Sequence, residues 1–283
     1  MFTRSTRSQT IVRRTVLTAL LALSLSALPG HGGASADEGA GAIFALTNAT
    51  TGNAVVAYHR AADGSLEPAG TYPTGGLGTG AGLGSQNAVI VTQVAFSYDG
   101  DTVIVAERAT NMISTFAVED DQLDGPFFTP SAGPTPFGLA VGQRNTVLVS
   151  EAGAGGGAST YRVTGDGVTA VSSAIMTGQR AACWAAVTPD GRFGYVTNAG
   201  TGNISGFAIA TDGSASLLDV DGVTAVTGGN PTDVAMSHDG RYLYARVANL
   251  SAIAVFRINS DGSLRALPSL IGSPAGLAGL AGF

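Results

Sequence analysis

Residues 47–58 read Thr47-Asn-Ala-Thr-Thr-Gly-Asn-Ala-Val-Val-Ala-Tyr58, and related segments recur four more times along the chain. Each copy closes on an aromatic residue. The last four copies end at Phe116, Tyr161, Phe207 and Phe256, so consecutive copies are 45, 46 and 49 residues apart. A repeat of this length built from short strands is typical of β-propeller blades. The sequence therefore predicts an all-β propeller with five modules of four-stranded blades.

Tight turns divide each module into four strands. The first turn is an Asp-Gly pair at 99–100, 190–191 and 239–240, and Gln143-Arg144 replaces it in one module. A second turn follows the aromatic residue, for example Asp63-Gly64 and Asp261-Gly262. Glycine supplies the positive φ that short hairpins need. The predicted modules cover about 41–76, 93–133, 135–178, 181–229 and 230–272.

The two ends of the repeat region complement each other. The first module starts at Ala42-Ile-Phe-Ala-Leu46 without the short strand that opens the other modules. The chain closes with Ser273-Pro-Ala-Gly-Leu-Ala-Gly279, which matches Thr135-Pro-Phe-Gly-Leu-Ala-Val141 at the start of a module. We therefore expect residues 274–281 to pair with Ala42 to Thr47 and to close the first blade, which would remove two exposed sheet edges.

One segment does not fit the repeat. Residues 85–92 resemble a module's first strand, yet a second such strand follows at once, and 58 residues separate Tyr58 from Phe116. We interpret this segment as a stray strand of an incomplete blade. Five modules can then form a closed ring or an open one, and an open ring would expose blade faces and favour oligomers.

The first 36 residues have the pattern of an export signal. Arg4, Arg7, Arg13 and Arg14 precede an apolar run, and Ala34-Ser35-Ala36 is a small-residue cleavage motif. We predict cleavage after Ala36, a domain over residues 37–283, and a secreted or extracytoplasmic location. The arginine pair leaves both Sec and twin-arginine export open. The mature chain has no apolar stretch long enough to span a membrane.

The composition excludes several classes of function. The 14 basic residues are all arginine and are outnumbered by 20 acidic residues, which argues against binding to nucleic acid. A chain without lysine has no Schiff-base or P-loop lysine. Cys183 is the only cysteine, so no intramolecular disulfide forms. Too few histidines remain after cleavage for a multi-histidine metal site. We predict no cofactor and no metal.

The repeat resembles a known family. Asp239-Gly-Arg-Tyr-Leu-Tyr244, Asp190-Gly-Arg-Phe-Gly-Tyr-Val-Thr-Asn198 and the Ile-x-x-Phe strand ends resemble the lactonase propellers, which include bacterial 6-phosphogluconolactonase and fungal carboxymuconate cyclase. Members of that family usually have seven blades. The resemblance therefore implies a member shortened by about two blades.

The family's catalytic site lies in the central channel and uses a histidine, two arginines and a glutamate. Glu151, in the segment Val-Leu-Val-Ser-Glu-Ala, matches the place of the glutamate. Phe137 and Gly138 stand where the family has an arginine and a histidine. Ala248 stands where the family has its second arginine, and Arg246 lies two positions before it. The resemblance thus implies Glu151 as the catalytic candidate and leaves most of the site unmatched.

Four further residues are candidates for ligand binding. Glu107 occupies the same place in its module as Glu151, so the two carboxylates could share a proton or a Ca²⁺ ion, or both could be ordinary residues at strand ends. Arg108, Arg180 and Arg246 could bind an anion, or could form local contacts instead. Trp184 could line a ligand platform or pack in the core.

Two functions follow from these observations. The first is a lactonase-like enzyme that hydrolyses or forms a small lactone, supported by the resemblance and Glu151. The second is a non-catalytic secreted propeller that binds a small carboxylate or lactone ligand or a cell-surface partner, supported by the missing basic residues and the export signal. A general acid or base and cations for a carboxylate substrate would be needed for the first.

Overall fold

The computed structural model describes residues 41–47, 49–51, 54–73, 91–108, 110–119, 122–165, 167–274 and 277–282. Residues 1–36, with the predicted signal, lie outside this range, as does most of the stray strand at 85–92. Val91 and Thr92 are described, and they belong to the first strand of a complete sheet. None of the described residues forms a helix of the length and apolarity that a membrane crossing requires.

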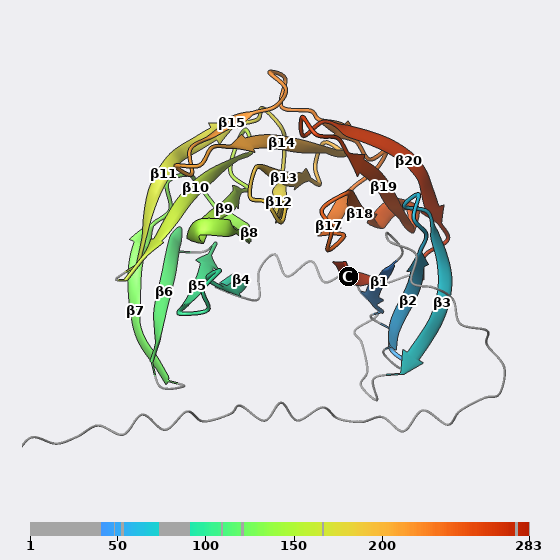
Figure 1. The fold of residues 1–283 in the computed structure, drawn as a ribbon, viewed down its shortest axis with the longest axis horizontal. Helices are drawn as coiled ribbons and strands as arrows, with labels where there is room; N and C mark the ends of the chain where they lie inside the picture. Colours follow the sequence, from blue (N-terminus) through green and yellow to red (C-terminus); the bar gives the residue numbers. More distant parts are fainter. Residues whose placement is uncertain are drawn as a thin grey trace, which may run out of the picture. The chain divides into compact units, whose positions relative to one another are not determined.

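The described strands form five antiparallel sheets, which we call blades 1 to 5 in chain order (Figure 1). Blade 1 contains β1 (Gly41–Leu46), β2 (Ala54–Arg60), β3 (Leu66–Pro73) and β21 (Ala278–Gly282). Blade 2 contains β4 (Val91–Phe96), β5 (Thr102–Glu107), β6 (Met112–Glu119) and β7 (Gln122–Pro130). Blade 3 contains β8 (Pro136–Gly142), β9 (Thr146–Glu151), β10 (Gly157–Thr164) and β11 (Gly167–Met176).

The last two blades follow the same order. Blade 4 contains β12 (Ala182–Val187), β13 (Phe193–Asn198), β14 (Asn203–Ile209) and β15 (Ala215–Leu217), with β16 (Ala225–Val226) also paired to β14. Blade 5 contains β17 (Pro231–Met236), β18 (Tyr242–Val247), β19 (Ala252–Ile258) and β20 (Leu264–Ile271). Two short 3-10 turns, η1 (Gln143–Asn145) and η2 (Ala248–Leu250), complete the described elements. The predicted all-β fold of propeller type is thus confirmed.

The first hairpin turn of three blades is built by a local hydrogen-bonding device. Ser97, Thr188 and Ser237 each donate a hydroxyl to the aspartate two residues later, at 2.6 Å in each case. The same hydroxyl oxygen accepts the first amide of the next strand. Blade 3 has no such residues, and η1 makes the turn there with Arg144 at φ 60°. This explains the departure seen in the sequence.

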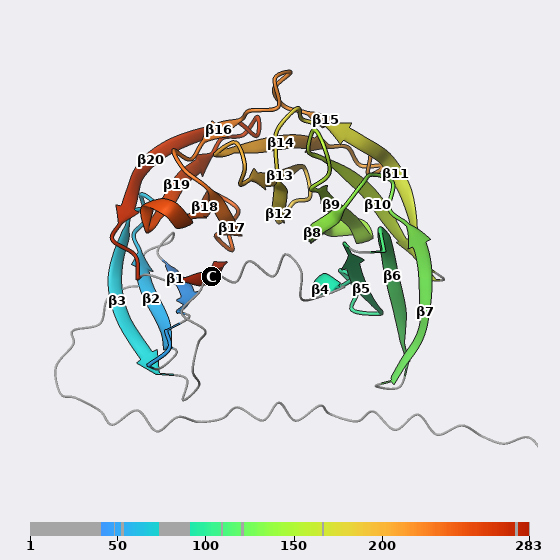
Figure 2. The same ribbon diagram turned by 180° about the vertical axis from the view of Figure 1, so that it is seen from behind.

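The predicted closure of blade 1 is confirmed, over a shorter strand than expected: β21 covers Ala278–Gly282, whereas residues 274–281 were predicted. Strand β21 pairs antiparallel with β1, from Ile43 opposite Gly282 to Leu46 opposite Ala278. The last strand therefore occupies the inner position that β4, β8, β12 and β17 occupy in the other blades. It also packs against β17 of blade 5. Figure 2 shows β1 to β3 next to the blade 5 strands from the opposite side.

Consecutive blades pack face to face through apolar side chains. One position in the second strand of blades 2 to 5 points toward the following blade and is fully buried. The residues at this position are Ile104, Leu148, Tyr195 and Tyr244. The four core clusters lie between blades 2 and 3, 3 and 4, 4 and 5, and 5 and 1. The packing order is therefore 2, 3, 4, 5, 1.

Candidate functional site

Every inner strand carries a β-bulge at the same place. The register shifts between Val91 and Gln93, Pro136 and Leu139, Ala182 and Ala185, and Pro231 and Asp233. Strand β21 has the equivalent irregularity opposite Ala45 and Leu46. A bulge re-aims the side chains it contains, and bulges are common beside functional sites. We call the bulged residues the bulge row: Thr92, Phe137, Gly138, Cys183, Trp184, Thr232 and Gly279.

Three side chains from three blades form a ladder: Phe137 and Trp184 of this row, and Arg108, which follows β5 of blade 2. The Phe137 and Trp184 rings meet edge to face, with their centroids 5.6 Å apart. The Arg108 guanidinium lies 5.9 Å from the centre of the Phe137 ring. Edge-to-face aromatic pairs and cations over ring faces are both attractive. All three side chains are partly exposed, so the ladder presents two aromatic rings with a cation beside them.

Cys183 belongs to the same row and is a partly buried free thiol. Its thiol donates to the carbonyl of Ala181. Burial raises the pKa of Cys183 to about 11, although the positive charge of Arg108 opposes this. A thiol needs a lowered pKa to act as a nucleophile at neutral pH. The structure thus places Cys183 in a packing role.

Glu151 lies at the end of β9 and is only 2% exposed. Its Oε1 accepts the hydroxyl of Ser159 from the next strand at 2.5 Å, and its carboxylate packs directly on the backbone of Gly133. Burial raises the pKa of Glu151, and the hydrogen bonds from Ser159 and Gly133 offset part of that rise. The carboxylate therefore holds its own blade together and does not face an open space.

Glu107 is held in the same way. It accepts the hydroxyl of Ser114 from the next strand and that of Thr110, the latter at 2.7 Å. Blade 4 has an amide at the equivalent place, where Asn198 donates to Ser205 at 2.8 Å. The two glutamates thus belong to a recurring link between the second and third strands. Within the described residues, no group of three His, Cys, Asp or Glu side chains could hold a metal ion.

The remaining arginine candidates make local contacts. Arg180 donates to the carbonyl of Gly200 at 3.1 Å within blade 4. Arg246 donates to the hydroxyl of Thr232 in the bulge of blade 5. Burial lowers the pKa of Arg246, and the neighbouring Asp233 carboxylate partly restores it. The described contacts do not bring Arg180 or Arg246 to the ladder.

Asp233 follows the blade 5 bulge and was not among the predicted site residues. Its carboxylate accepts the backbone amides of Val234 and of Leu280 in the closing strand. Burial raises the pKa of Asp233 to about 6, against the opposing effect of these hydrogen bonds and of Arg246. Asp233 thus fastens β21 to blade 5.

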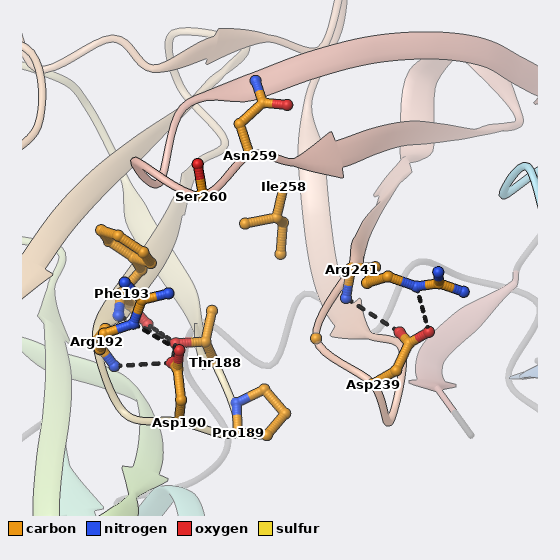
Figure 3. A pocket seen from close by; sticks show the side chains of 11 residues that line it. Thr188, Pro189, Asp190, Arg192, Phe193, Asp239, Arg241, Ile258, Asn259 and Ser260 are labelled. Carbon is orange, nitrogen blue, oxygen red and sulfur yellow. Dashed lines mark hydrogen bonds and ion pairs between the residues drawn. The ribbon is translucent and has the colours of Figure 1, made fainter. Parts of the chain in front are cut away.

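A polar cavity of about 270 Å³ lies between blades 4 and 5 (Figure 3). Its walls are the first hairpin turns of both blades and the end of β19, far from the bulges along the inner strands. Arg192 pairs with Asp190 and Arg241 with Asp239, each at 2.7 Å. Both cations are therefore already neutralised within their own turns. None of the residues predicted as site candidates lines this cavity.

These observations define the class of protein: a propeller-type protein whose candidate site is the bulge row on its inner strands. Residues 166–277 match the family model described as "Lactonase, 7-bladed beta-propeller". The chain is 32% identical over 138 residues to 6-phosphogluconolactonase of Erwinia tasmaniensis. The matched residues make up 47% of this chain and 40% of that relative. The resemblance to the lactonase propellers is thus confirmed for this part of the chain, which spans less than half of the curated relative's length.

Solved structures show the same fold. The chain matches Pseudomonas aeruginosa periplasmic gluconolactonase, PpgL, with a TM-score of 0.55 and 19% identity over 84% of this chain and 69% of that one. It also matches a putative 6-phosphogluconolactonase from Bacteroides fragilis, with a TM-score of 0.56 and 15% identity over 83% of this chain and 71% of that one. At these identities the likeness concerns the fold alone.

Proposed function

We propose that this chain is a ligand-binding propeller of lactonase type that recognises a small ring bearing a carboxylate, such as a sugar acid, without turning it over. The observation that supports this most is the ladder of Arg108, Phe137 and Trp184. Aromatic faces pack on the C–H groups of a ring, and a guanidinium pairs with a carboxylate through two parallel hydrogen bonds. The ladder brings both kinds of group together.

The burial of Glu151 argues against turnover. A general base must come within hydrogen-bonding reach of the proton that it removes. Glu151 is instead 2% exposed, and its Oε1 accepts the hydroxyl of Ser159. Phe137 and Gly138 supply no proton-transferring group where the lactonase propellers have basic residues. The site that remains is suited to holding a ring.

The single tryptophan of the chain makes binding directly measurable. Trp184 is part of the ladder, so its fluorescence should change saturably when glucuronate, a sugar ring that bears a carboxylate, is titrated into the protein. Arg108→Gln should weaken binding about tenfold, because it removes a charge-assisted contact. Arg265→Gln, an exposed arginine on β20, is the matched control and should leave the titration unchanged. An equal response of both variants would refute the proposal.

Lactone turnover is the second candidate, because the curated relative is a 6-phosphogluconolactonase and Glu151 occupies the place of the family's glutamate. We would measure hydrolysis of several sugar lactones by the purified chain and by Glu151→Gln. Glu67→Gln, at an exposed position on β3, is the control. No turnover above the buffer rate is expected. Turnover that Glu151→Gln abolishes and Glu67→Gln preserves would instead establish the enzyme.

We also propose that residues 1–36 direct export and are removed. Mass spectrometry of secreted protein should show a chain that starts at Asp37. Replacing Arg13 and Arg14 together by lysine should block export only if the twin-arginine route is used. Retention of the uncleaved chain inside the producing cell would contradict the proposal.

A further inference from the structure

The two aromatic residues of the ladder belong to bulges that lie directly against each other. Gly138 follows Phe137 in the bulge of blade 3, and Cys183 precedes Trp184 in the bulge of blade 4. A Cβ on Gly138 would lie 2.3 Å from the carbonyl oxygen of Cys183 and 2.8 Å from the Cα of Trp184. The backbones of the two bulges are therefore in contact, and only a residue without a side chain fits at position 138.

One buried hydroxyl joins these two bulges. Ser150 lies on β9, opposite the bulge of blade 3, and is fully buried. Its Oγ accepts the amide of Gly138 at 2.8 Å and donates to the carbonyl of Cys183 in blade 4. The carbonyl of Gly138 lies farther from this Oγ, at 3.3 Å. A hydroxyl has one proton and two lone pairs, so Ser150 can accept from blade 3 and donate to blade 4 at the same time.

A second buried hydroxyl holds the bulge of blade 4 from its own blade. Thr197 lies on β13 at the place that Ser150 has on β9, and it is also fully buried. Its Oγ1 accepts the amide of Trp184 at 3.1 Å. The carbonyl of Cys183 and the amide of Trp184 belong to one peptide group, which is planar. Ser150 and Thr197 therefore bind the two ends of this group and fix its orientation.

We propose that Ser150 and Thr197 are positioning residues of the ladder, which hold the Trp184 ring edge to face with Phe137 before any ligand binds. Neither hydroxyl belongs to the ladder, and both act through the backbone that carries it. Side chains that are already ordered lose less conformational entropy when a ligand binds, so this arrangement should favour affinity. That consequence rests on the proposed function, because it requires that the ladder bind a carboxylate ligand.

The ligand-free protein provides the first test, because Trp184 is the only tryptophan of the chain and its fluorescence reports its own surroundings. Ser150→Ala should shift the emission of Trp184 to longer wavelength and increase its quenching by acrylamide, since the released ring becomes more exposed to water. Ser150→Thr keeps a hydroxyl, as Thr197 does in blade 4, and should keep the original emission and quenching.

Ser205→Ala is the matched control for loss of a buried hydroxyl. Ser205 is fully buried on β14, and its Oγ accepts the side-chain amide of Asn198 at 2.8 Å and donates to the carbonyl of Gly222 at 2.5 Å. It therefore makes two hydrogen bonds like those of Ser150, but neither involves a bulge. Unchanged emission and quenching in Ser150→Ala, or an equal change in Ser205→Ala, would overturn the proposal.

Circular dichroism and a thermal melt establish that each variant is folded. If Ser150→Ala does not fold, Thr197→Val tests the same peptide group from its other end, because it removes the acceptor of the Trp184 amide and keeps the shape of the side chain. It should shift the emission and increase the quenching in the same direction. Emission and quenching like those of the original chain would overturn the proposal.

Titration with glucuronate separates this proposal from the proposed function. Ser150→Ala should weaken glucuronate binding about two- to tenfold, because the rings must then be ordered on binding, whereas Ser205→Ala should bind like the original chain. Unchanged affinity in Ser150→Ala, despite a shifted Trp184 emission, would overturn the role in binding. If the original chain does not bind glucuronate, the proposed function is wrong, and the ligand-free spectra still decide whether Ser150 positions Trp184.

Discussion

The hydroxyl of Tyr242 donates to the carbonyl of Ala62 at 2.6 Å, across 180 positions of sequence. Blade 4 makes the same link to blade 5, where the Tyr195 hydroxyl donates to the carbonyl of Gly262 at 2.8 Å. A tyrosine of one blade thus holds the second turn of the following blade. The Tyr242 hydrogen bond therefore fixes blade 1 beside blade 5, the last blade along the chain.

Tyr242→Phe should therefore destabilise the fold by about 1–2 kcal/mol, because it removes one hydrogen bond and leaves the carbonyl of Ala62 without that donor. Urea denaturation at neutral pH measures the change. Tyr98→Phe removes a hydroxyl from a tyrosine that is 64% exposed and should change stability by less than about 0.5 kcal/mol. Equal effects of the two substitutions would mean that the link contributes nothing.

Removal of the closing strand should destabilise the chain and promote aggregation. Deleting residues 274–283 unpairs β1 along β21 and exposes the edge of a sheet. Each lost backbone hydrogen bond should cost about 0.5–1.5 kcal/mol. Leu280→Pro is a finer test, since it removes the amide that donates to Asp233 and the packing of one partly buried leucine while the rest of the strand stays. Melting curves that match the full chain would show that closure adds no stability.

Asp233 should make stability depend on pH. Its pKa rises from 3.8 to about 6 on folding, so the folded state binds the proton more tightly than the unfolded state. The free energy of unfolding should then fall as pH rises from about 4 to about 6, by up to about 3 kcal/mol, and stay level above that range. Asp233→Asn should reduce this slope, and the remainder is expected from Glu151, whose pKa burial also raises. Urea denaturation across pH 4–7 is the measurement, and the same slope in both proteins would contradict the assignment.

Two glycines with the same backbone conformation separate strain from crowding. Gly64 has φ +89°, and a Cβ there would lie 2.4 Å from the Tyr242 ring. Gly100 has φ +84°, with nothing within 4 Å of such a Cβ. Gly100→Ala should cost about 1–2 kcal/mol from the backbone alone. Gly64→Ala should cost about 1–3 kcal/mol more, since the ring must also move. Thermal denaturation of both variants would show whether this difference exists.

Much of the fold could be predicted because its signals are local. An Asp-Gly turn, an alternating strand and a terminal aromatic lie within about ten residues of one another, and their recurrence at 45 to 49 residues fixes the blade. The closing strand could be predicted as well, since Ser273 to Gly279 repeats the start of another module. The candidate site was harder to predict from the sequence. The sequence placed Glu151 and Glu107 at strand ends, and only the structure shows that a serine of the next strand donates to each carboxylate. Glu151 is buried and Glu107 is partly buried.

The sequence by itself determined the repeat, the turn chemistry and the order of strands within each blade, because these depend on neighbouring residues. Only the tertiary structure decided two further features. A bulge turns Phe137 and Trp184 toward each other from different blades, and strict strand alternation gives no sign of it. The exposure of Phe96 depends on which blade lies beside it, and its covered equivalents Val141, Val187 and Met236 have the same apolar character. Whether such a side chain is buried depends on the neighbouring blade, and the identity of the residue alone does not determine it.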